Sequence, residues 1–117
     1  MSPVEFKART KSFALRVIKV AEALPRDSIS KALGNQLLRS GTSVAANYRA
    51  SARAKSNADF ISKMGTVEEE CDESLFWMEL LVESQRLTSS QLQPLICEGT
   101  ELLAMTVASI KTAKRRS

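Results

Sequence analysis

The chain has 117 residues, of which 44% are hydrophobic and 26% are charged, so it is long enough for one globular domain with one hydrophobic core. Histidine is absent and cysteine occurs twice, which excludes histidine-based catalysis, histidine-ligated metal centres and a disulfide scaffold. The N-terminus does not resemble a secretory signal and no apolar run is long enough to span a membrane, so we expect a cytoplasmic protein without a membrane segment.

Two segments with apolar residues at helical spacing make up the first half of the chain. The first covers residues 4–24 and ends before Pro25, because proline disfavours a helical conformation in the residue that precedes it. The second begins near the caps offered by Asp27 and Ser28 and runs to about residue 54. Gly41 interrupts it, so two shorter helices are an alternative, but the apolar stripe keeps its phase and favours one long helix. That stripe contains Ile29, Leu33, Leu37, Val44 and Tyr48.

Two further helices are predicted in the second half. The third covers residues 58–87 after a cap at Ser56, and the fourth follows a polar break at residues 88–90, with Pro94 in its first turn. No segment alternates between apolar and polar residues, so the predicted fold is all-α, an antiparallel up-down four-helix bundle. Residues 1–117 form a single domain, with a short frayed basic tail at residues 114–117.

The net charge of +4 is distributed unevenly. Residues 1–63 carry twelve basic and four acidic side chains (+8), residues 64–101 carry one basic and nine acidic side chains (−8), and the last sixteen residues add four basic ones. This asymmetry indicates a surface that binds polyanions, self-association of opposite surfaces, or both. The alternative is that basic and acidic helices neutralise each other within the bundle.

Residues 74–82 are too apolar for one side of a bundle helix, because seven of the nine side chains are hydrophobic and they point all around the helix. We therefore predict that Phe76, Trp77 and Leu80 form an interface between subunits of a homo-oligomer. The alternative is that neighbouring helices and the following loop cover them. Residues 40–50 are rich in small side chains and predict a close approach of two helices.

Acidic residues provide the one constellation that could support catalysis. Glu69, Glu70, Asp72 and Glu73, with Glu98 and Glu101 on the next helix, loosely match the carboxylates of all-helical, magnesium-dependent nucleotide hydrolases. A solvated acidic face and ion pairs with basic helices explain the same residues, so we expect no enzyme activity, no metal site and no cofactor. Cys71 lies on the apolar stripe and Cys97 has no base beside it, so we expect both thiols to be inert.

Four cations share one side of the predicted second helix, opposite its apolar stripe. Lys31, Arg39, Arg49 and Arg53 lie on this arc, and Lys55 extends it, so we predict that these five residues contact nucleic-acid phosphates. Aromatic residues do not alternate with them, so base stacking is not indicated. In the competing interpretation one of the arginines pairs with Glu69 or Glu73, and Arg49 is the residue we expect to do so.

The chain also resembles a known family in three stretches, residues 39–50, 58–65 and 69–81. These stretches are similar to the four-helix bundle proteins of 23S ribosomal RNA intervening sequences, which are related to the accessory variability protein of diversity-generating retroelements. The resemblance implies a bundle that assembles into a ring, commonly a pentamer with a basic central region. For retroelement members it also implies nucleic-acid and reverse-transcriptase binding.

From the residues and the resemblance together, we expect a non-enzymatic, homo-oligomeric four-helix bundle that binds RNA or DNA through a basic helix face. The alternatives are a structural scaffold that binds only protein and a metal-dependent nucleotide hydrolase with its carboxylates on the third helix.

Overall fold

The first two helices begin at polar side chains that cap their first turns, in a computed structural model that describes residues 1–117. Helix α1 (Pro3–Ala23) follows Ser2, whose hydroxyl accepts a hydrogen bond from the Glu5 N–H while the Glu5 carboxylate accepts one from the Ser2 N–H. Helix α2 (Ser28–Ser51) is capped by Asp27, as predicted. Both helices end within three residues of their predicted ends.

The other two helices begin in the same way. Ser56 caps α3 (Asn57–Glu83), and Thr88 caps α4 (Ser89–Arg115). Helix α3 is shorter than the predicted segment 58–87, because Gln85 adopts a positive φ of 64° and ends the helix. Such left-handed ends usually occur at glycine or asparagine, so the sequence carries no clear signal for this one.

Helix α4 is longer than predicted at both ends. It begins at Ser89, so Pro94 occupies its sixth position and lies in the second turn, not in the first as predicted. At the other end the helix continues to Arg115, which places half of the tail predicted to be frayed, residues 114–117, within regular structure. The side chain of Asn57 helps to hold this end, because its amide donates hydrogen bonds to the Ala113 carbonyl and the Ser117 hydroxyl.

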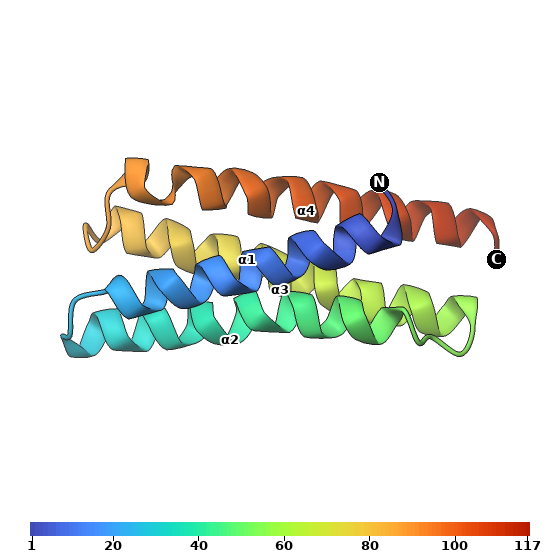
Figure 1. Cartoon of the computed structure of the whole chain (residues 1–117), viewed down its shortest axis with the longest axis horizontal. Helices are drawn as coiled ribbons and strands as arrows, with labels where there is room; N and C mark the ends of the chain where they lie inside the picture. Colours follow the sequence, from blue (N-terminus) through green and yellow to red (C-terminus); the bar gives the residue numbers. More distant parts are fainter.

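The four helices pack in sequence, each antiparallel to the next, as an up-down bundle (Figure 1). Helix α2 packs on α1 and α3, and α3 packs on α4, whereas α1 and α4 contact each other much less. The molecule measures 47 × 21 × 20 Å, and both termini lie at the end where α2 and α4 finish. None of the four helices is apolar over enough residues to cross a membrane.

The small-residue segment of α2 allows the close helix approach that the sequence predicts. Helix α2 is continuous through Gly41, which lies against the fully buried Val17 of α1; a Cβ at this position would stand 2.7 Å from a Val17 methyl carbon. On the neighbouring side of α2, Ser40 and Ser74 of α3 share a buried hydrogen bond of 2.8 Å. Small side chains therefore bring α2 close to both of its neighbours.

One continuous core runs the length of the bundle. It includes the fully buried side chains Phe13, Val17, Leu37, Val44, Met64, Val67, Met78 and Leu102. The apolar stripe predicted for α2 is correct except at Ile29, which is 54% exposed because Ser30, the residue after it, takes the buried position in the first turn.

Candidate nucleic-acid interface

Two cationic segments that are far apart in the sequence meet at one end of the bundle. Helices α2 and α4 both finish there, and we call this part of the molecule the basic end. Seven cations of this end are exposed and make no ion pair; they are Arg49, Arg53, Lys55, Lys111, Lys114, Arg115 and Arg116. Lys63 of α3 lies near the same end but pairs with Asp59. Cations at helix C-termini interact favourably with the helix dipoles, which explains why they are tolerated so close together.

Three of the five predicted binding residues lie at this end. Arg49 is in the last turn of α2, Arg53 follows the helix in a turn, and Lys55 lies in the loop that leads to α3. The expectation that Arg49 pairs with a glutamate of the third helix is wrong, because its side chain is exposed and unpaired. Lys31 is also exposed, but it lies 18 residues before Arg49 on the same helix, about 27 Å away along its axis.

Arg39 does not belong to a free cationic surface. Its guanidinium donates to the Glu70 carboxylate at 2.9 Å and also to Glu73, so that it joins α2 to α3. Glu73 accepts a further hydrogen bond from the Trp77 indole at 3.2 Å. Hydrogen bonding by Arg39, and then by Trp77, lowers the pKa of the Glu73 carboxyl. The prediction that Arg39 is a free phosphate-binding residue is therefore corrected: it is a partner in an ion pair between helices.

The contribution of the C-terminal cations to this surface was not predicted, because residues 114–117 were expected to form a frayed tail. Lys114 and Arg115 belong to the last turn of α4, and Arg116 caps the helix, so the structure fixes their positions relative to the end of α2. The available signal was the run of four cations in residues 111–116, combined with the antiparallel order of the helices. That order alone places the ends of the second and fourth helices together.

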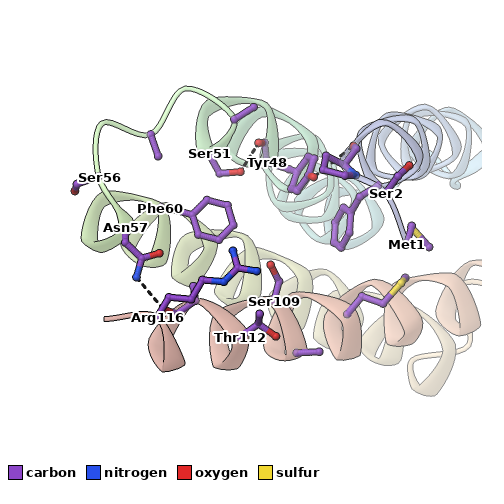
Figure 2. A pocket seen from close by; sticks show the side chains of 17 residues that line it. Met1, Ser2, Tyr48, Ser51, Ser56, Asn57, Phe60, Ser109, Thr112 and Arg116 are labelled. Atoms are coloured by element: carbon purple, nitrogen blue, oxygen red, sulfur yellow. Dashed lines mark hydrogen bonds between the residues drawn. The ribbon is translucent and has the colours of Figure 1, made fainter.

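A pocket of about 830 Å³ opens at the basic end between the two cationic segments. All four helices contribute to its walls, which include Phe6, Tyr48, Phe60, Ser109, Thr112 and Arg116. Figure 2 shows the Phe60 ring and the Arg116 side chain directed into the same space. No acidic residue lines this end pocket.

Two stacked aromatic rings form the apolar base of the end pocket. The rings of Phe6 and Tyr48 stack with their centroids 4.4 Å apart, and the Tyr48 hydroxyl donates to the Pro3 carbonyl. Burial raises the pKa of the Tyr48 hydroxyl. Phe60 is half-buried and packs against the edge of the core, so part of its ring is accessible from the pocket.

The comparison with protein families gives one match that covers most of the chain. The family described as 23S rRNA-intervening sequence protein matches residues 4–108. The chain belongs to this family. It is also similar to the crystal structure of a protein of unknown function from the S23 ribosomal protein family of Bacteroides thetaiotaomicron. The two are 32% identical with a TM-score of 0.88, and the match covers 95% of this chain and 99% of the other. No curated protein matches the chain.

In this family member the acidic residues that could suggest a hydrolase are divided between two sides of the bundle. Glu70 and Glu73 face Arg39, whereas Glu98 and Glu101 bind Arg9 of α1, with Arg9–Glu98 distances of 2.6 and 2.9 Å. No group of three metal-ligating side chains lies close enough to hold a metal ion. Glu70, Glu73, Glu98 and Glu101 are ion-pair partners that join helices, whereas Glu69 and Asp72 are exposed and make no ion pair.

The outer face of α3 carries the apolar residues predicted to form an interface. Phe76 is 48% exposed, and Leu80 is partly exposed and lies outside the core. Trp77 packs against the core edge, with its ring in an edge-to-face contact with Phe76 at 5.1 Å. Of the three predicted interface residues, Phe76 is thus the most available for another molecule, and Trp77 is covered in part by its own bundle.

The two cysteines have different environments. Cys71 is fully buried, and its thiol donates to the Gly99 carbonyl at 3.2 Å. Burial, with a smaller effect from the Asp72 charge, raises the pKa of the Cys71 thiol to about 12, so it remains protonated at neutral pH. Cys97 is exposed on α4.

Proposed function

We propose that this chain is a non-enzymatic, homo-oligomeric four-helix bundle that binds nucleic acid through its basic end. One observation carries the proposal: Arg49, Arg53 and Lys55 lie at the same end of the bundle as the cations of residues 111–116, and none of these side chains forms an ion pair with a carboxylate. Unpaired lysines and arginines gathered on one surface favour binding to phosphates through release of counterions. Because these cations would contact the phosphate backbone of the nucleic acid and not its bases, we expect little preference for base sequence.

A charge-matched pair of double variants tests where the nucleic acid binds. We expect Arg53→Gln with Lys55→Gln to weaken RNA and DNA binding and to reduce the slope of log affinity against log salt by about two, since each phosphate contact contributes about one. The control is Arg26→Gln with Lys31→Gln, which removes the same charge from exposed, unpaired residues at the other end of the bundle. The control slope should equal that of the wild type.

Filter binding of RNA and duplex DNA at about 50 to 200 mM salt measures both slopes. Equal losses in the two double variants would refute the basic end as the site and support a contact spread along α2. Failure of the wild type to retain any RNA or DNA at low salt would refute nucleic-acid binding and leave the protein-binding scaffold as the function.

The proposal includes assembly into a ring, for which the resemblance implies five subunits. Phe76 and Leu80 lie on an outer face of α3 that is also acidic, and the outer face of α1 carries Leu15 and Ile18, which are 54% and 37% exposed, beside Lys11. An acidic apolar face and a basic apolar face complement each other in charge. Pairing of two different faces is the arrangement that closes rings of more than two subunits.

Light scattering tests the assembly. The wild type should have a mass several times 12.9 kDa, and Phe76→Ser should lower it, because the variant removes the most exposed aromatic ring of the proposed interface. Ile29→Ser removes an apolar side chain of similar exposure from α2 and serves as the control that keeps its mass. A monomeric wild type would refute the ring.

A further inference from the structure

The end pocket is large enough to hold a ligand and lies where the proposed nucleic-acid contacts converge. Its volume of about 830 Å³ falls within the range of pockets that enclose small molecules. The loop residues Ala52, Ala54 and Ser56 form one rim, next to Arg53 and Lys55, and Arg116 forms another. A strand bound to the cations of the basic end would therefore pass the pocket mouth.

The chemistry of the walls fits a flat, apolar group with polar edges and an adjacent negative charge. Phe60 offers part of an aromatic ring to the pocket. Thr100 and Thr106 of α4 donate to carbonyls one turn earlier, whereas the hydroxyls of Ser109 and Thr112 make no hydrogen bond within the chain. Arg116 has no carboxylate partner, so its guanidinium is free to bind an anion.

We infer that the end pocket receives one unpaired base of a single-stranded nucleic acid, with the base against Phe60 and a neighbouring phosphate on Arg116. The inference rests on the proposed function and adds to it a preference for single strands. A base within a duplex is stacked and paired, and it cannot enter a pocket without being extruded at a cost in free energy. Aromatic side chains stabilise unpaired bases by stacking, with little dependence on their identity.

Two substitutions within the pocket test the inference, with a labelled RNA of about 12 nucleotides and the duplex of the same sequence as probes. Phe60→Leu keeps an apolar side chain against the core but removes the ring, and we expect it to lower affinity for the single strand about five- to fiftyfold. Affinity for the duplex should be unchanged, which also shows that the variant is folded and assembled.

Arg116→Gln provides a second test that does not depend on the core, because Arg116 is exposed. Its matched control is Arg115→Gln, an exposed arginine one residue earlier that does not line the pocket. We expect Arg116→Gln to weaken single-strand binding more than Arg115→Gln does, and the two variants to weaken duplex binding equally.

The possible results separate this inference from the function on which it rests. If wild-type protein binds RNA but Phe60→Leu and Arg116→Gln reduce single-strand and duplex affinity by the same factor, or not at all, the base pocket is refuted and the basic end stands. If neither probe is bound by the wild type, both are refuted. A single-strand loss confined to the two pocket variants supports the base pocket.

Discussion

The close packing of α1 against α2 predicts opposite effects for the same substitution at two glycines. Gly41 faces Val17, and a Cβ there would stand 2.7, 2.8 and 3.0 Å from three Val17 carbons, whereas carbon atoms in contact prefer about 3.5–4.0 Å. Val17 is fully buried and β-branched, so it has little freedom to rotate away. Gly65 lies inside α3 with no neighbouring atom within 4 Å of such a Cβ.

The expected magnitudes follow from these two environments. Alanine at either position gains about 1 kcal/mol of helix propensity over glycine. At Gly41 this gain is opposed by an overpacking cost of about 1–3 kcal/mol, so Gly41→Ala should destabilise the bundle by about 1 kcal/mol. Gly65→Ala should stabilise it by about 0.5–1 kcal/mol, because nothing opposes the gain. The two variants should differ by roughly 2 kcal/mol, or about 8 °C in melting temperature for a chain of this size.

Urea unfolding followed by circular dichroism measures both free energies of unfolding, and thermal unfolding gives the second comparison. The double variant Gly41→Ala with Val17→Ala adds a check, because the smaller side chain makes room for the new methyl group. We expect the double variant to lose less free energy of unfolding than the sum of the losses in the two single variants, by about 1 kcal/mol or more. Equal stability of Gly41→Ala and Gly65→Ala would refute the close approach of α1 and α2.

Three further predictions concern ion pairs and thiols. Arg9 holds the pKa of the Glu98 carboxyl below its usual value, so the pair stabilises the folded state above about pH 4.5, and this contribution is lost as the pH falls through the lowered pKa. Glu98→Gln should therefore cost about 1–2 kcal/mol at pH 7 and less near pH 3, measured by urea unfolding. A maleimide should modify Cys97 alone in the native protein and also Cys71 in urea, counted by mass spectrometry. Arg39→Gln should leave the slope of log RNA affinity against log salt unchanged. A reduced slope would show that Arg39 contacts a phosphate after all.

The sequence predicts the fold well because helix periodicity and capping are local signals. Asp27 and Ser56 mark helix starts, because each side chain accepts a hydrogen bond from the backbone N–H three residues later and no distant residue is needed to recognise it. The end of α3 is less predictable, since Gln85 takes the left-handed conformation without the glycine that usually marks it. Tertiary contacts, including the packing of Leu87 against the core, accompany that turn.

The candidate site is predicted less completely, because pairing between helices depends on their relative rotation. Periodicity correctly places Arg39 on the outer arc of α2, but it cannot show that Glu70 and Glu73 of the next helix reach the same place. The end pocket cannot be predicted from periodicity for the same reason, since its walls come from all four helices. Phe60 lies at helical spacing from the fully buried Met64 and Val67, so the sequence pattern gives no sign that part of its ring is open to a pocket at the bundle end.

The uneven charge of the chain has two physical explanations that apply to different residues. Cations near the middle of the bundle face carboxylates across a helix boundary: Arg39 joins α2 to α3, and Arg9 joins α1 to α4. The cations of the basic end have no such partners, because the acidic part of the chain, residues 64–101, lies along the middle of the bundle and towards its opposite end. Helix dipoles favour cations at the last turns of α2 and α4, yet this effect does not neutralise them. A charge that the bundle itself leaves unpaired is the charge that remains available to a polyanion.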